Sequence, residues 1–455
     1  MDWLERAFAV CIFFYTAFGA CNLTHRTWVI SAALYAMTAV GAVLLVYRAA
    51  SFRKFIKTPL LPCAVLMWLS YLASAFFNRA YINKDAVVFF AMWTLFFFLL
   101  YAHDGEEDPS HVYRNLRLFS ILHMGWTTLL ALISFGMLFA NYDSSYVELD
   151  NGSYTVAAGI HEGRLWGAFQ DPNLGAVMCV AVIALCVYWY RRCGKKWLRG
   201  ALIADGVVML LYIAMSDSRN GMLCLGVVCA VGLCFYWFDR KRRKQKLTYY
   251  ALGIVLACVA LAAGFCAPKL VQRGYNAAAE LVVESAPKSS ALKKIERDYK
   301  LNKTIADQSN RRFWVWQSGI DIAMSRPLTG VSFVGVVPYA EEHMPDTYIV
   351  NNDYWDMNTF DSEIFNLFAA QGFPGLIILI VWFALAVILF FRCVGRMEPG
   401  DKDEIAILTV LVCVLITSAL NQGTMFYQMT PNAVLFWLAF GDLLFVLAKA
   451  RRREV

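Results

Sequence analysis

The sequence predicts an all-helical, polytopic membrane protein, and three observations support this fold class. Hydrophobic residues make up 59% and charged residues 16% of the 455 residues, whereas soluble domains carry about 45–50% and about 25%. Such a chain has more apolar side chain than one soluble core could hide. Basic residues also concentrate in alternate links between the apolar runs. Twelve of these runs are long enough to cross a bilayer, near 7–23, 28–47, 58–77, 85–102, 117–140, 171–190, 198–215, 219–238, 248–267, 373–392, 403–422 and 431–449.

The first run is expected to stay in the protein as a span. Asp2 and Glu5 precede it and only Arg6 opposes them, whereas a signal peptide begins with a positively charged segment. The stretch Phe18-Gly19-Ala20-Cys21 is a poor lipoprotein cleavage site. Later runs carry Pro59 and Pro431 near their starts, as membrane helices allow.

Basic residues set the predicted orientation. If both termini are cytoplasmic, the inner links and tails hold 25 of the 41 lysines and arginines, and the short outer loops hold five. This asymmetry follows the positive-inside rule. An odd number of spans would destroy it, so we expect twelve.

Two outer segments are long, 141–170 and 268–372, and the second divides the chain. We expect a membrane domain over 1–267 with spans one to nine, a large external loop over 268–372, and a second membrane part over 373–455. Within the loop, 269–303 has the spacing of an amphipathic helix pair, and 336–361 is expected to be an ordered loop. No cysteine lies between Cys266 and Cys393, so this loop can form no disulfide.

The link between spans seven and eight carries the first candidate site. Ser216-Asp217-Ser218-Arg219 is too short to leave the membrane surface, so Arg219 must lie near the outer interface. Its guanidinium could simply snorkel to water. It could equally grip a phosphate group with two parallel hydrogen bonds, which arginine does better than lysine.

A second motif, from Gly163 to Asn173, opens span six. Asp171 before Pro172 has the pattern of a helix N-cap, which is a structural role. Arg164 and Asn173 are not needed to start a helix, so both are candidates for substrate binding.

A third cluster includes Arg311, Arg312 and Trp316, followed by Pro327 and Gly330. Arg312 and Trp316 are four residues apart and share a helical face. They could form a plain cation–π pair on the surface, or Arg312 could be a second clamp on a diphosphate.

The fourth cluster, Asp356 to Phe365, lies just before span ten. Carboxylates beside aromatic side chains such as Tyr354 are what sugar hydroxyls and sugar faces require. Asp361 could act as a general base, or its carboxylate could only cap a helix. The sequence has no Walker A, G-x-G-x-x-G or H-E-x-x-H element, so we predict no metal, nucleotide cofactor or nucleic-acid partner.

Taken in chain order, the four clusters resemble the bacterial O-antigen ligase and polymerase family. The resemblance covers roughly 160–395 and rests on Arg164…Gly167…Phe169…Pro172-Asn173, Ser216-Asp217-Ser218-Arg219, Arg312…Trp316, Pro327…Gly330, and Asp361-Ser362 before Gly372…Gly375. Ligases of the family carry a His-Asn pair where this chain has Asp361-Ser362, and polymerases resemble the Asp form more often.

The resemblance implies a metal-independent glycosyltransferase of the bacterial plasma membrane, with its active site facing outward. It would polymerise oligosaccharide repeat units linked to undecaprenyl diphosphate. The alternatives are an O-antigen ligase that transfers the glycan to lipid A-core, and a secondary transporter of an anionic solute. Membrane lipid, a chain-length regulator and a flippase are the expected partners. The expected catalytic residues are Asp361, Arg219 and Arg312, and the expected substrate-binding residues are Arg164, Asn173, Arg311, Trp316, Ser218 and Tyr354.

Overall fold

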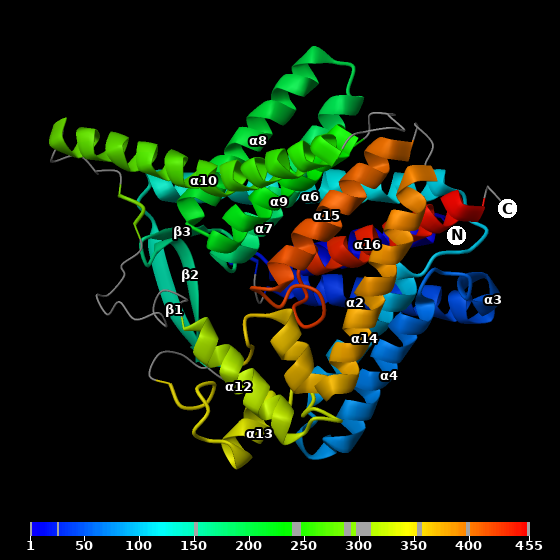
Figure 1. The fold of residues 1–455 in the computed structure, drawn as a ribbon. Helices are drawn as coiled ribbons and strands as arrows, with labels where there is room; N and C mark the ends of the chain where they lie inside the picture. The colour runs from blue at the N-terminus through cyan, green and yellow to red at the C-terminus, as the bar shows by residue number, and fades with distance from the viewer. Residues whose placement is uncertain are drawn as a thin grey trace.

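The computed structural model describes residues 2–24, 27–149, 153–238, 247–285, 293–296, 311–352, 357–396 and 401–452, and its architecture is a bundle of helices (Figure 1). A helix occupies each of the twelve predicted spans. These are α1 Asp2–Gly19, α2 Trp28–Ala50, α4 Leu61–Phe77, α5 Lys84–Leu95 with its continuation η2 Phe96–Tyr101, α6 Pro109–Phe139, α7 Pro172–Arg192, α8 Lys196–Ser216, α9 Arg219–Phe238, α10 Leu247–Ser285, α14 Glu363–Cys393, α15 Lys402–Ala419 and α16 Pro431–Arg452.

Eight of the described helices are long and apolar enough to cross a membrane, and α4 and part of α9 are shorter apolar helices. Burial separates inner from outer helices. In the most apolar window, 83% of α16 and 72% of α7 are buried, against 17% of α2 and 11% of α10. Many large apolar side chains on α2 and α10 are exposed, as expected for helices that face lipid. The prediction of a polytopic helical membrane protein is confirmed.

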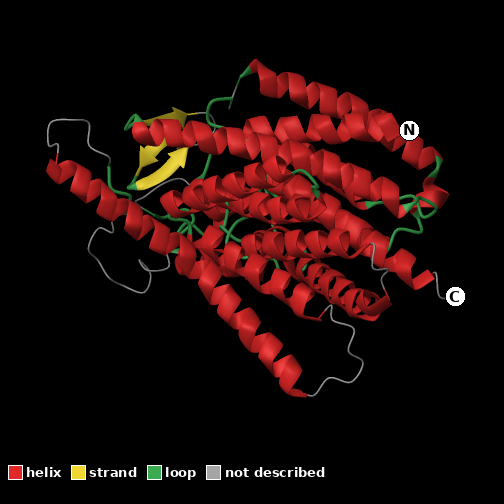
Figure 2. Ribbon diagram, turned by 90° about the horizontal axis from the view of Figure 1, so that it is seen from above, coloured by secondary structure: helices red, strands yellow, loops and turns green. Residues whose placement is uncertain are grey.

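The helical prediction omitted one small sheet. Strands β1 Asp143–Leu149, β2 Ser153–His161 and β3 Arg164–Gly167 form an antiparallel sheet in the order β1-β2-β3. The strands are rich in Tyr, Val and Thr, which favour extended chain. Figure 2 shows this sheet at one end of the bundle, with both termini toward the other end.

The predicted external loop begins inside a helix. α10 continues without a break past Pro268 to Ser285, so its second half is the first part of the predicted helix pair. The remainder of that pair falls largely outside the described residues. Two shorter helices follow, α12 Arg312–Ser325 and α13 Val336–His343, and α13 lies within the stretch predicted as an ordered loop. The remaining short helices are α3 Phe52–Phe55, η1 Arg79–Tyr81 and η3 Val394–Arg396.

Ion pairs gather at the helix ends predicted to be cytoplasmic. Buried Glu404, at the start of α15, pairs with Arg117 of α6 and Arg192 of α7. Nearby, Arg191 pairs with Asp403 at 3.0 Å. These contacts place the start of α6, the end of α7 and the start of α15 together, as the predicted parity of the spans requires.

Candidate active site

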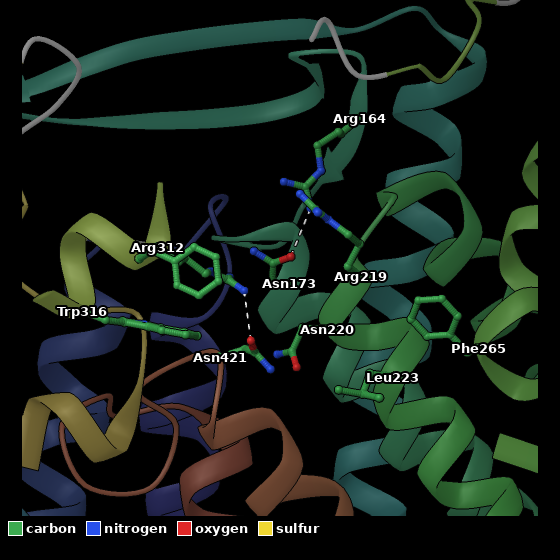
Figure 3. Close-up of a pocket in the computed structure, with 10 residues that line it drawn as sticks. Arg164, Asn173, Arg219, Asn220, Leu223, Phe265, Arg312, Trp316 and Asn421 are labelled. Carbon is green, nitrogen blue, oxygen red and sulfur yellow. Dashed lines mark hydrogen bonds between the residues drawn. The ribbon is translucent and has the colours of Figure 1, made fainter. Parts of the chain in front are cut away.

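A recess of about 290 Å³ opens at the N-terminal ends of α7 and α9, away from these ion pairs. Three of its ten lining residues are arginines that come from β3, α9 and α12, and Figure 3 shows how they surround the same space. The full lining is Arg164, Asn173, Arg219, Asn220, Leu223, Phe265, Arg312, Phe313, Trp316 and Asn421.

Arg164 is held by the backbone and by α7. It is the first residue of β3, and only 8% of it is exposed. Its Nε donates to the Ser216 carbonyl at 2.8 Å, and one terminal nitrogen donates to Asn173 Oδ1 at 3.2 Å. Asp171 caps α7 by accepting from the backbone N–H of Asn173 at 2.7 Å, as its sequence predicts. The cap thus fixes the helical turn that presents Asn173 to the recess.

Arg219 follows a sharp turn between α8 and α9. Asp217 takes a left-handed conformation with φ of 47°, which ends α8 and reverses the chain. Ser218 is fully buried, and its Oγ donates to Asn173 Oδ1 at 2.9 Å and accepts from Gly221 N–H at 3.1 Å. Lys269 of α10 pairs with Asp217. The link is therefore fixed on both sides, while the exposed side chain of Arg219 extends into the recess.

Arg312 and Trp316 lie one turn apart on α12, as their spacing predicts. Arg312 donates to Asn421 Oδ1 at 3.3 Å. The ring of Trp316 stacks on Phe365 of α14, with centroids 5.1 Å apart and an interplanar angle of 22°. These two contacts orient α12 against the α15–α16 loop and against the start of α14.

Asp361 lies beside the recess rather than in its lining. It precedes α14 in a left-handed conformation with φ of 50°, and the N–H of the preceding Phe360 donates to Asn366 Oδ1 at 2.9 Å. The side chain of Asp361 is exposed at the protein surface, but the protein around it displaces much of the surrounding water. This desolvation raises the pKa of Asp361 above its ordinary value, Arg312 opposes the rise, and Asp171 adds to it. Asp361 is therefore electrostatically coupled to Arg312.

The structure brings together five of the residues predicted from sequence: Arg164, Asn173, Arg219, Arg312 and Trp316. Ser218 lies beneath them and orients Asn173 instead of reaching the recess. Arg311, which is the N-cap position of α12 with φ of 62°, is not among the lining residues of the recess. Tyr354 lies outside the described residues.

Sequence reasoning missed half of the lining residues: Asn220, Leu223, Phe265, Phe313 and Asn421. Asn421 was detectable as an amide at the end of the apolar run 403–422, next to Gln422. Leu223 and Phe265 carried no local signal, because apolar residues are ordinary in a span.

The donor set favours an anion. None of the ten described residues that line the recess is a carboxylate, histidine or cysteine, so the lining offers guanidinium groups and amides instead of metal ligands. The one described His and carboxylate group that could hold a metal, Glu5, Glu107 and His111, lies at the other end of the bundle. Arginines arranged in this way fit phosphate oxygens.

Comparison with known families matches residues 206–380 to the O-antigen ligase family. This match covers less than half of the 455 residues. The match supports the family resemblance predicted from the ordered motifs. It also supports a function of the O-antigen ligase and polymerase type, since this family implies a membrane enzyme that transfers glycosyl groups in polysaccharide biosynthesis. The family implies a lipid-linked glycan as substrate. No curated protein matches the chain significantly.

The family match and the recess overlap only in part. Arg219, Arg312 and Trp316 lie inside the matched O-antigen ligase region, whereas Arg164 and Asn173 precede it. The hydrogen bonds of Asn173 to Arg164 and Ser218 connect the two parts of the site.

Proposed function

We propose that this protein polymerises oligosaccharide repeat units carried on undecaprenyl diphosphate, at the outer face of the bacterial plasma membrane. The observation that carries the proposal is the convergence of Arg164, Arg219 and Arg312 on one recess at the end of the bundle opposite the ion-paired, basic end. A diphosphate ester is the anionic group that such a set of guanidiniums fits.

The positive-inside pattern supports the orientation. The helix ends with most basic residues would face the cytoplasm, with both termini there, so the recess would open outward. In that position the enzyme would receive substrate from a flippase and work beside a chain-length regulator.

The reaction needs stabilisation of the leaving group. An acceptor hydroxyl attacks the anomeric carbon of the donor sugar, the new C–O bond forms, and the bond from that carbon to the diphosphate oxygen breaks. Negative charge grows on the leaving diphosphate, where Arg219 and Arg312 would stabilise it, aided by Arg164. These guanidiniums would do so without a metal ion.

Asp361 would take the proton from the acceptor hydroxyl. Its raised pKa makes the carboxylate a stronger base than an ordinary aspartate, and the electrostatic effect of Arg312 keeps it from rising further. The Asp361-Ser362 pair, in place of the ligase His-Asn pair, supports polymerisation over ligation.

Mass spectrometry of lipid-linked glycans tests the proposal. A deletion strain would receive either the wild-type chain or Arg219→Ala. Single repeat units on the lipid in the deletion strain, with long chains restored only by the wild type, are the expected result.

Two other outcomes would contradict the proposal. Long glycans left on the carrier lipid in the deletion strain would identify a ligase. An unchanged glycan profile would reject both enzymes and favour an anion transporter, which uptake into proteoliposomes driven by an ion gradient would then detect.

A further inference from the structure

The first turn of α14 contains a buried carboxylate that the proposed chemistry does not use. Glu363 is 0% exposed, and its carboxylate accepts from the backbone N–H groups of Met425 at 2.8 Å and Phe426 at 3.1 Å. A buried carboxylate is costly unless such donors are present. The segment that Glu363 binds therefore indicates its role.

Glu363 fixes the loop 420–430 between α15 and α16. The carbonyls of the same two residues are also held, because Trp437 Nε1 donates to Met425 O at 2.7 Å and Trp93 Nε1 donates to Phe426 O at 2.8 Å. Glu363 therefore accepts from the N–H groups of Met425 and Phe426, and two buried tryptophans donate to the carbonyl groups of the same residues.

The same loop carries Asn421, and Asn421 is the link to the recess. Its Oδ1 accepts from Arg312 at 3.3 Å, and both residues line the recess (Figure 3). An unbroken path therefore runs from the Glu363 carboxylate through the 420–430 loop to the Arg312 guanidinium.

We propose that Glu363 is a positioning residue that fixes the 420–430 loop so that Asn421 holds Arg312 in place for the diphosphate. The inference rests on the proposed function, in which Arg312 stabilises the leaving group. Glu363 itself touches no reacting atom, and it acts through the loop and Asn421.

The same helical turn serves Asp361 through a separate contact. Asn366, one turn after Glu363, accepts from the N–H of Phe360, which precedes Asp361. Glu363 and Asn366 thus have distinct targets, and their substitutions should have distinguishable effects.

A double-mutant cycle on the full-length protein tests the proposal. The substrate would be lipid-linked repeat units extracted from the deletion strain, and kcat and KM would be measured for Glu363→Gln, Asn421→Ala and the double variant. The glutamine keeps the side-chain volume but replaces one acceptor oxygen with an N–H donor. Each single change should lower kcat by roughly 10- to 100-fold.

The double variant should have the same kcat as the more impaired of the two single variants, because both changes break one path. A general folding defect would instead lower kcat by the same factor in either background. Glu342→Gln is the matched control, since Glu342 is an exposed glutamate of α13 that accepts from Tyr81, and it should retain wild-type kcat.

Three results would overturn the proposal: wild-type kcat in Glu363→Gln, wild-type kcat in Asn421→Ala, or losses that multiply in the double variant. If Glu363→Gln does not fold, Asn421→Ala alone decides, because it leaves the Glu363 contacts intact. Inactive Arg312→Ala with active Glu363→Gln and Asn421→Ala would reject only this inference. Wild-type activity of Arg312→Ala would reject the arginine clamp of the proposed function.

Discussion

The amide oxygen of Asn173 accepts a hydrogen bond from the guanidinium group of Arg164 at 3.2 Å, and this contact joins β3 to the first turn of α7. The same oxygen accepts from Ser218 at 2.9 Å, so the α8–α9 link meets the other two elements at one atom. A neutral amide orients Arg164 here without cancelling its charge. The site thus keeps its positive charge for a ligand.

A carboxylate in place of this amide should reduce turnover. Asn173→Asp retains the acceptor oxygen but pairs with Arg164 as an ion and competes with the diphosphate. We expect a fall in kcat/KM of about tenfold or more with normal folding, since charge-assisted pairs are the stronger ones. The measurement is turnover of lipid-linked repeat units, and wild-type kinetics would contradict the assigned role of Asn173.

Loss of either central arginine should nearly abolish turnover. Arg219→Ala and Arg312→Ala each remove a donor to the charge that develops on the leaving diphosphate, which is worth about 100- to 1,000-fold in kcat. Protein abundance in the membrane should not change. Arg191→Ala, which removes an exposed arginine at the far end of the bundle, is the matched control for kcat.

The pH dependence should report on Asp361. Because its pKa is raised, the carboxyl binds a proton at a higher pH than an ordinary aspartate, and the acid limb of kcat/KM should lie above about pH 3.9. Arg312 lowers this pKa, so the limb should move to still higher pH in the residual activity of Arg312→Gln. A limb that stays fixed would separate Asp361 from Arg312.

The raised pKa of Asp361 also predicts that its ionised carboxylate lowers the stability of the fold. A carboxyl whose pKa is raised by folding binds more protons in the folded state, so its contribution to stability falls as pH rises through that window. Asp361→Asn should therefore be inactive, yet unfold at the same or a higher temperature at neutral pH. A lower unfolding temperature would show that the charge of Asp361 supports the fold.

Gly372 should tolerate no side chain. It interrupts α14 with φ of 64° and ψ of −159°, and an added Cβ would lie 2.4 Å from the Pro327 carbonyl oxygen. The Phe373 N–H donates to that same oxygen at 2.8 Å, so the Pro327–Gly330 turn packs directly on the kink.

Gly372→Ala should cost about 1–3 kcal/mol in backbone strain, plus the clash. Thermal unfolding in detergent measures it. The control is Gly136→Ala in α6, where an added Cβ meets nothing within 4 Å and helix propensity favours alanine by up to about 1 kcal/mol. Equal unfolding temperatures for the two variants would contradict the packing of the kink.

Glu404 should matter for stability more than its exposed neighbour. Glu404→Gln removes a buried charge shared by Arg117 and Arg192 and should destabilise the fold. The loss should be smaller than the about 3–5 kcal/mol of a fully buried pair, because water can still solvate the two partly exposed arginines. Asp403→Asn breaks the more exposed pair with Arg191 and should cost at most about 1 kcal/mol. Turnover per folded molecule should stay unchanged in both variants, and a specific loss of kcat would show coupling between the two ends of the bundle.

The sequence alone determined where a helix occupies each of the twelve predicted spans, because hydropathy and length are properties of each segment by itself. It also predicted the Asp171 cap of α7 and the shared face of Arg312 and Trp316, since capping and helical spacing act over a few residues. The resemblance to the O-antigen ligase family, which the match over 206–380 supports, was predicted from ordered motifs, none of which is specific alone.

Only the tertiary structure decided which helix ends meet. Asn421 and Arg312 are 109 residues apart, and Asn173 and Ser218 are 45 apart, yet each pair is in hydrogen-bond contact. Such contacts depend on how the helices pack around α7 and α16, which no single segment encodes. The sheet and the buried role of Glu363 are further products of that packing, because a strand needs its partner and a buried carboxylate needs donors from another segment.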